Sequence, residues 1–209
     1  KSKLVKRLLD FSNSELNEDE ISKIFGVISS SDFDIKNAQS ELSKVNISEE
    51  IIECYYRPFE KKHIYFDRII VDRPRKELLL HSKKKDNLLL GIGRQGLAVG
   101  DIDWCLTIVS RHPVDANIFR RGGANLFPLY LYQDNAGQQI IEQSNERKPN
   151  LNLEIVNQIA EKIGLTFTNE KQSNESTFAP IDILDYIYAV LHSPTYRETY
   201  KEFLKIDFP

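Results

Sequence analysis

The sequence contains no methionine, two cysteines and four histidines in 209 residues. Cys54 and Cys105 each lie in an apolar, strand-like run, which favours buried thiols over a disulfide or a metal pair. The histidines do not repeat at the spacing of metal ligands, so we predict no metal site. They are His63, His81, His112 and His192.

The chain begins with Lys1, and the absence of methionine from a chain of this size is unusual. We expect the chain to be a piece of a longer polypeptide. Omission of modified methionines from the sequence would also explain the methionine count of zero. No window approaches the run of about 18 apolar residues that a membrane span needs. The first residues, KSKLVKRLLDF, lack the apolar core and cleavage site of a secretory signal. The expected location is therefore the cytoplasm, with no membrane contact.

Charge is distributed unevenly along the chain. Between Arg57 and Lys85 there are ten Lys or Arg and four Asp or Glu, a balance of +6, although the whole chain carries -3. Aromatic and β-branched residues alternate with basic ones there, which is typical of strands with a positively charged exposed face. A basic face on a mildly acidic protein predicts an anionic partner, of which a nucleic acid is the simplest.

The hydrophobic pattern divides the chain into three segments. Residues 1–50 read as a helical linker, with a capping signal at Asn17 and Glu20, apolar residues at helical spacing as far as Ile28, and a further helix over 32–44. Residues 51–148 read as a β-rich region with strands expected at 51–59, 63–71, 87–92, 103–110 and 125–132. Residues 149–209 read as a helical subdomain packed on that region, whose first helix ends at Gly164. Because helices and strands do not alternate regularly, we predict an α+β fold: a mixed β-sheet between an N-terminal helical linker and a C-terminal helical bundle.

Several motifs resemble catalytic signatures without their context. Residues 91–96, GIGRQG, fit the dinucleotide-binding pattern G-x-G-x-x-G, but the following residues read as a turn and strand, so no helix would hold a pyrophosphate. Residues 60–62, Glu-Lys-Lys, match the E-x-K half of a nuclease motif. The simpler interpretation is a charged turn. The carboxylates Asp182 and Asp185, like Glu198 and Glu202, are one helical turn apart and read as solvated faces. We therefore predict binding rather than catalysis, with no catalytic residues.

An ordered series of short motifs carries a family resemblance. It comprises YRPF at 56–59, HIYFD at 63–67, DRPR at 72–75, NLLLGIGRQG at 87–96, NLFPLYLY at 125–132 and the closing TFAPIDILDYIYAVLHSPTYRETYKEFLKIDFP. From about Tyr55 to its end the chain resembles the C-terminal target-recognition, or specificity, domain of type ISP and related single-chain restriction-modification enzymes. The mixed sheet would then be the target-recognition domain.

The resemblance implies a division of labour within a parent polypeptide. In that family one chain carries a restriction endonuclease, often an ATP-dependent translocase, a site-specific adenine-N6 methyltransferase that uses S-adenosylmethionine, and this module that reads DNA. The Asn-Pro-Pro-Tyr/Phe and glycine-rich methyltransferase motifs do not occur here. We therefore expect the fragment to bind no cofactor. S-adenosylmethionine and Mg²⁺, and ATP where the translocase is present, would serve the parent enzyme. Its expected partners are double-stranded DNA and the methyltransferase and other domains of the same polypeptide.

The basic and amide side chains in these motifs are the candidate DNA-binding residues. Arginine reads guanine and glutamine or asparagine reads adenine, whereas other cations neutralise phosphates. Arg94 and Gln95, flanked by Gly91, Gly93 and Gly96, are the strongest candidates for base reading. The full set is Arg57, Arg68, Arg73, Arg75, Arg94, Gln95, Arg111, His112, Asn117, Arg120 and Arg121.

Two alternatives stay open. Any one of these cations could be an ordinary exposed charge, and Arg57 and Arg73 could form structural ion pairs with Asp67 or Asp72. At the level of the whole chain, the alternative function is a protein-interaction or scaffold domain whose basic patch docks a partner domain.

Overall fold

The computed structural model describes residues 1–30, 33–67, 69–70, 78, 81–93, 104–119, 123–132 and 147–207. Its contacts group the chain into two compact units. The N-terminal unit comprises Lys1–Cys54 and Glu60–Lys76, and the C-terminal unit comprises Tyr55–Phe59 and Glu77–Pro209. The division falls in the first hairpin, so residues of the expected linker share a unit with part of the expected β-rich segment.

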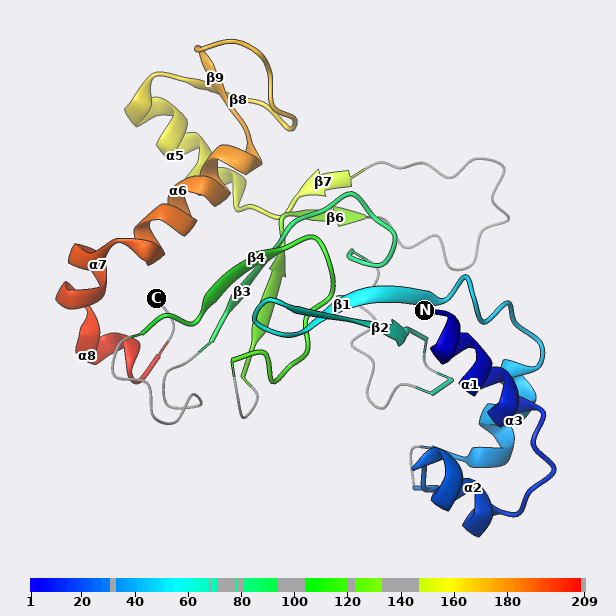
Figure 1. The fold of residues 1–209 in the computed structure, drawn as a ribbon. Coiled ribbons are helices and arrows are strands. Elements are labelled where there is room, and N and C mark those ends of the chain that lie inside the picture. Colours follow the sequence, from blue (N-terminus) through cyan, green and yellow to red (C-terminus); the bar gives the residue numbers. More distant parts are fainter. Residues whose placement is uncertain are drawn as a thin grey trace, which may run out of the picture. The chain divides into compact units, whose positions relative to one another are not determined.

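In the described part of the N-terminal unit the helices are α1 Ser2–Ser12, α2 Glu18–Phe25 and α3 Ile35–Leu42 (Figure 1). The capping signal is confirmed, because Asn17 Oδ1 accepts the Glu20 N–H and the Glu20 carboxylate accepts the Asn17 N–H. The helical pattern was expected to reach Ile28, which is wrong. Gly26 takes a left-handed conformation, φ 70°, and ends α2 there.

The core of this unit is apolar and contains one buried amide. The buried side chains are Leu8, Phe11, Ile21, Ile35, Ala38, Leu42, Ile47, Ile51 and Tyr65. Gln39 is buried among them and donates to the Phe11 carbonyl at 2.7 Å and the Ser14 carbonyl at 3.1 Å, which ties α3 to the end of α1. The amide therefore supplies donors to two carbonyls at and just beyond the C-terminal end of α1.

A two-stranded sheet of β1 Ile51–Arg57 and β2 Glu60–Tyr65 follows. The second strand was predicted over 63–71 and Glu60 to Lys62 as a charged turn; both predictions are wrong. Phe59 has φ 65°, so the chain reverses at residues 58–59 and the three charged residues lie in β2. The tight reversal sets the register of β2 against β1. The alternation of apolar residues alone did not reveal where the chain reverses.

The C-terminal unit is organised on an antiparallel three-stranded sheet in the order β4-β3-β5. Its strands are β3 Leu89–Ile92, β4 Thr107–Ser110 and β5 Asn125–Pro128. A second sheet pairs β6 Tyr130–Tyr132 with β7 Arg147–Pro149. The run 125–132 was expected as one strand but is β5 and β6, divided at Leu129, whose N–H donates to the Leu88 carbonyl at 2.8 Å.

Gly91 and Gly93 are required by packing. Gly91 lies in β3 between Ile108 and Leu126, and a Cβ there would be 2.8 Å from Ile108 Cγ2. A Cβ on Gly93 would be 2.8 Å from the Phe119 ring. Since β3 is antiparallel to both of its neighbours, this motif does not open the parallel β-α-β unit of a dinucleotide site. We expected these glycines to flank a reading loop, but Gly91 belongs to the strand itself.

The side chains of Asn87, which is buried, and His81, which is partly buried, join the start of β3 and the turn before it to β6. Asn87 Nδ2 donates to the carbonyls of Tyr130, at 2.7 Å, and His81, at 2.8 Å. Asn87 Oδ1 accepts the N–H groups of Tyr130, at 3.0 Å, and Leu88, at 2.9 Å. His81 Nδ1 accepts the Tyr132 N–H at 3.0 Å. Two side chains thus replace ladder hydrogen bonds along one edge of β6.

Helices α6 Pro180–His192, α7 Pro194–Thr199 and α8 Lys201–Leu204 follow one another along the sheet (Figure 1). Leu184, Leu191 and Leu204 enter the same core as Leu90, Leu106 and Trp104. Helix α5 Leu153–Ile163 and the parallel pair β8 Thr166–Phe167 and β9 Thr177–Phe178 precede them. Gly164, φ 69°, ends α5 as predicted.

The fold class is confirmed as α+β: helices and small, mostly antiparallel sheets occupy separate stretches of the chain. Among the described residues no helix is long and apolar enough to cross a membrane.

Cys54 is buried as predicted, whereas Cys105 is exposed, and neither forms a disulfide. Asp182 is a cap rather than a solvated face, since its Oδ2 accepts the Ala179 N–H at 2.9 Å. Glu198 and Glu202 form exposed pairs with Lys201 and Lys205.

The His81 hydrogen bond predicts a pH dependence of stability. Burial lowers the pKa of His81 below 6.5, and only the neutral ring accepts the Tyr132 N–H. A lowered pKa in the folded state gives stability that is present above the unfolded value and is lost as pH falls through the folded value. His81→Asn places an amide oxygen near Nδ1 and does not titrate. We expect its urea midpoint to change less between about pH 7.5 and pH 5 than that of the unsubstituted chain.

The comparison also controls for His192, whose pKa is lowered by burial and by Arg197 and which is present in both proteins. Equal losses of stability on acidification in both proteins would contradict the assignment to His81.

Candidate nucleic-acid interface

Loop 111–119 follows β4 and contains three of the predicted DNA-binding residues: Arg111, His112 and Asn117. Ser110, the last residue of β4, is buried; its Oγ donates to the His112 carbonyl at 2.7 Å and accepts the His112 N–H at 2.9 Å. At the other end the Asn117 N–H donates to Asp115 Oδ1 at 2.7 Å, and Ile118 is buried. These local bonds fix the loop backbone and leave Arg111 and Asn117 on the exposed surface.

The end of β1 holds the same loop. The Tyr55 N–H donates to the Pro113 carbonyl at 2.9 Å, and the Asp115 N–H donates to the Tyr55 carbonyl at 2.8 Å. Tyr55 and Val114 form a parallel bridge, and the Tyr55 and His112 rings are 6.0 Å apart. Main-chain hydrogen bonds therefore join residues more than fifty positions apart. They fix loop 111–119 against the end of β1.

Arg57 lies beside this loop with its guanidinium fixed in three ways. Its Nη1 contacts Asp115 Oδ1 at 3.3 Å and donates to the Tyr56 carbonyl at 2.5 Å, and the guanidinium carbon lies 4.0 Å from the centre of the Tyr56 ring. The sequence suggested Asp67 or Asp72 as the acid of a structural pair, and the structure provides Asp115. The Arg57 side chain is 40% exposed, so the same residue remains accessible to an anion.

Turn 81–86 adds a second basic element that the predicted residue set does not include. Lys83, Lys84 and Lys85 lie in this turn, and Lys84 has φ 55°. Arg111 joins the turn to loop 111–119 through Asp86 Oδ1, at 3.1 Å. Both side chains of this pair are more than two-thirds exposed, so the pair contributes little stability and can exchange partners. The signal that could have identified the turn was the run of three consecutive lysines.

Arg147, by contrast, is a structural cation. Its Nε and Nη2 donate to the two carboxylate oxygens of Glu170, both at 2.8 Å, and its Nη1 donates to the Asp86 carbonyl at 2.6 Å. The guanidinium carbon lies 4.0 Å from the Tyr130 ring centre. The hydrogen bonds to Glu170 raise the pKa of Arg147, and the same bonds lower the pKa of Glu170. Burial is the main cause of the raised pKa of the Tyr130 hydroxyl.

Seven predicted residues lie outside the described part of the chain and stay predictions. They are Arg68, Arg73, Arg75, Arg94, Gln95, Arg120 and Arg121. Within the described ranges the structure brings Arg57, Arg111, His112 and Asn117 onto one loop and the strand end that holds it. No group of three or more His, Cys, Asp or Glu residues among the described positions could hold a metal ion. The arrangement can bind an anion through exposed cations on a fixed backbone.

The described residues form an α+β fold with basic side chains on turn 81–86 and loop 111–119. The family model for the Type ISP C-terminal specificity domain matches residues 1–209, and the chain belongs to that family. A comparison with curated proteins gives no match.

Solved structures share the fold at low sequence identity. The ATP-dependent Type ISP restriction-modification enzyme LlaBIII bound to DNA is similar over 99% of this chain and 12% of its own, with 23% identity and a TM-score of 0.64. The DrdV–DNA complex is similar over 100% and 18%, with 17% identity and a TM-score of 0.63. A nuclease-deletion mutant of the Type ISP enzyme LlaGI, in complex with a DNA substrate mimic, is similar over 98% and 16%, with 23% identity and a TM-score of 0.52. The chain thus spans less than a fifth of each of these proteins.

The contrast between Arg147 and Arg111 gives a stability prediction. Lysine keeps the charge but cannot form the bidentate contact with Glu170 or stack on Tyr130 in the same way. We expect Arg147→Lys to lower the free energy of unfolding by about 1–2 kcal/mol in urea titration, given that part of the contact is solvent-exposed. Arg111→Lys, the matched control at an exposed pair, should change it by less than about 0.5 kcal/mol. Equal effects of the two substitutions would show that Arg147 does not have the structural role described.

Proposed function

We propose that this chain recognises a specific sequence in double-stranded DNA, as the specificity module of a restriction-modification polypeptide. The observation that carries the proposal is the match of the Type ISP specificity-domain family to the whole chain. The similar folds of enzymes described as bound to DNA support it, and so does the basic surface of turn 81–86 and loop 111–119. Endonuclease and adenine methyltransferase activity, with S-adenosylmethionine, Mg²⁺ and ATP, would belong to other domains, so the module itself is not catalytic. Such an enzyme would act on DNA in the cytoplasm.

Residues in this module would divide into two classes. Cations that contact phosphates supply affinity without discriminating among sequences, and Lys83, Lys84, Arg57 and Arg111 suit this role because they lie on a fixed and accessible backbone. Arg68, Arg73 and Arg75 are proposed for the same role from the sequence. Base-reading side chains need two matched hydrogen-bonding groups, which Arg94, Gln95, Arg120 and Arg121 have, as does Asn117. His112 is placed to orient the loop against Tyr55.

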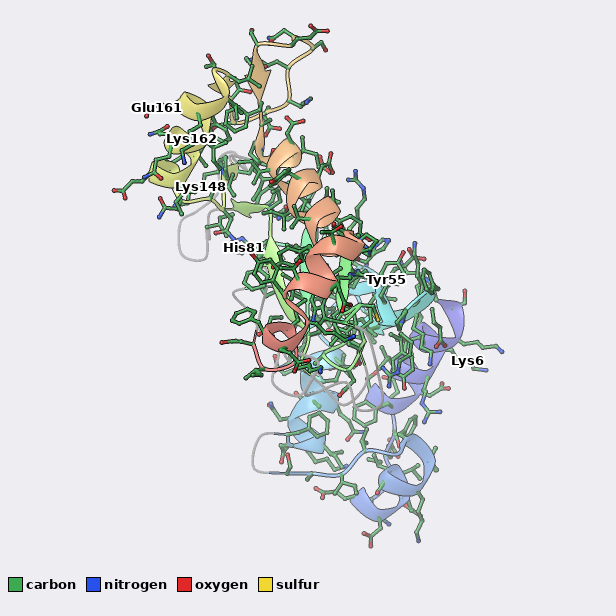
Figure 2. All side chains as sticks on the ribbon, turned by 90° about the vertical axis from the view of Figure 1, so that its left-hand side faces the viewer. Lys6, Tyr55, His81, Lys148, Glu161 and Lys162 are labelled. Atoms are coloured by element: carbon green, nitrogen blue, oxygen red, sulfur yellow. The ribbon has the colours of Figure 1, made fainter. Side chains whose placement is uncertain are left out.

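Phosphate contact by turn 81–86 predicts a change in salt dependence. Each phosphate contact that is lost should reduce the slope of log K against log salt by about 1. We expect Lys83→Ala and Lys84→Ala each to show this decrease on every duplex sequence, measured by fluorescence anisotropy over a range of KCl concentrations. Lys162→Ala is the matched control: Lys162 is an exposed lysine on α5, away from the labelled His81 and Tyr55 (Figure 2).

A slope that is equally reduced by Lys162→Ala would indicate a diffuse charge effect in place of contacts at turn 81–86. A chain whose binding to random duplex is insensitive to salt would instead favour a protein-docking role for the basic surface.

Base reading predicts a different signature. Arg94→Ala and Gln95→Ala should each weaken binding to the correct site by about 1–3 kcal/mol and relax preference at one base pair, while binding to random duplex is nearly unchanged. The measurement is competition between randomised sites, followed by sequencing of the bound fraction. Equal loss of affinity on all sequences would assign these two residues to phosphate contact.

A further inference from the structure

The chain reverses between β1 and β2 at Pro58 and Phe59, and the fold does not explain why the second of these residues is aromatic. The Phe59 side chain is 100% exposed, so its ring adds nothing to a core. Its φ is 65°, in the left-handed region that costs free energy for a residue with a Cβ. Proline followed by a left-handed residue is the pattern of a type II turn, whose left-handed position is normally glycine or asparagine. The ring is therefore available to a partner at some cost to the fold.

The backbone that carries Phe59 is fixed against the basic loop. Arg57, two residues before it, contacts Asp115 Oδ1 at 3.3 Å, and main-chain hydrogen bonds join β1 to loop 111–119. Residues Tyr55–Phe59 belong to the same compact unit as that loop. The ring is thus presented by a strand end that is already held beside the cations proposed to contact DNA.

The surroundings of Phe59 indicate the kind of partner. Residues 60–62, Glu-Lys-Lys, are exposed and charged, and the Arg57 side chain is 40% exposed, so Phe59 is a single exposed apolar ring among charges. A protein interface buries a group of apolar side chains at its centre, which residues 57–62 do not provide. Duplex DNA instead has an anionic backbone for the cations and stacked bases for the ring. The combination favours DNA over a protein as the partner of this turn.

We propose that Phe59 inserts its ring into a base step when this chain binds DNA. Apolar side chains that enter a base step partly unstack it and kink the duplex, and pyrimidine–purine steps unstack most easily. The inference rests on the proposed function and adds a specificity-determining residue to it, because the ring favours sites with a flexible step at the point of insertion. A phenyl ring forms no hydrogen bond with a base edge. Its selectivity therefore adds to that of base-reading side chains such as Asn117.

Two substitutions at Phe59 separate the ring from the turn. Asparagine tolerates the left-handed conformation, so Phe59→Asn should leave the melting temperature of the chain unchanged or raise it. Phe59→Tyr keeps an aromatic ring and should bind DNA as the unsubstituted chain does. Tyr186→Asn, which removes a 72% exposed aromatic side chain from α6, is the matched control. The probe is the duplex that the unsubstituted chain selects from randomised sites.

Loss of an apolar contact differs from loss of a phosphate contact in its dependence on salt. We expect Phe59→Asn to weaken binding to the selected duplex about tenfold, as for the loss of one aromatic stacking contact. The slope of log K against log salt should stay unchanged, because the substitution removes no phosphate contact and so alters no counterion release. The measurement is fluorescence anisotropy over a range of KCl concentrations. Tyr186→Asn should change neither the affinity nor the slope.

Insertion is measured at the base step itself. The fluorescence of the adenine analogue 2-aminopurine rises when the base is unstacked, and the analogue is placed at one position of the selected duplex at a time. We expect brightening at one step with the unsubstituted chain and with Phe59→Tyr, and none there with Phe59→Asn. A mismatch at that step lowers the cost of unstacking. The ratio of mismatched to matched affinity should therefore be larger for the unsubstituted chain than for Phe59→Asn.

Failure of this inference and failure of DNA recognition give different results. If the chain selects a site but Phe59→Asn binds it equally well, or binds it more weakly without a loss of brightening, insertion is wrong and DNA recognition stands. A contact with another domain would then be the role left for the ring. Equal weakening by Tyr186→Asn, or a lower melting temperature of Phe59→Asn, would also overturn the inference. If no duplex is selected from the randomised sites, both proposals fail.

Discussion

The C-terminal unit depends on one buried amide, that of Asn87. Its oxygen accepts two backbone N–H groups and its nitrogen donates to two backbone carbonyls, so the side chain uses its full hydrogen-bonding capacity in the core. Aspartate lacks the two donors, and an apolar residue would leave all four backbone groups without partners. The Asn87 bonds join β3 to β6 and also fix the carbonyl of His81, where the basic turn begins. Asn87 thus fixes the start of turn 81–86, and Arg147 fixes its end by donating to the Asp86 carbonyl.

Arg147 and the ion pair at Arg111 show how the same kind of residue serves two purposes in one unit. Both side chains contact Asp86, but Arg147 is held by a bidentate carboxylate, a backbone carbonyl and an aromatic face, and it is only 22% exposed. Arg111 has an exposed partner in Asp86 and lies on the surface. A phosphate can replace a solvent-exposed carboxylate at little cost, whereas it cannot compete with a preorganised bidentate contact. A charge count along the sequence cannot distinguish a structural arginine such as Arg147 from an exposed one such as Arg111. The contacts in the structure do distinguish them.

Local chemistry was predictable from the sequence and pairing was not. The caps at Asn17 and Gly164 depend on a few neighbouring residues, and the sequence located both. The bounds of β2 were wrong because the reversal at Phe59 sets the register, and the run 125–132 was divided because Leu129 pairs with Leu88. Gly91 and Gly93 fitted a phosphate-binding pattern. Glycine is required at these positions because Ile108 and Phe119, from other parts of the chain, approach the backbone closely. The partners of Arg57 and Arg147 are 58 and 23 residues away, distances at which sequence patterns carry no information about contact.

Net charge is a poor guide to function in this chain because charges of opposite sign are gathered in different places. The whole chain carries -3, which alone would argue against a polyanion as partner. The C-terminal unit nevertheless presents lysines and arginines on a turn and a loop whose backbones are fixed by Asn87, Ser110 and Tyr55. The N-terminal unit gathers carboxylates around a buried phenol. At physiological ionic strength charges act over about 8 Å, so an approaching ligand responds to the local group of charges and not to their sum. A domain of this kind can therefore attract DNA at one surface although its net charge is negative.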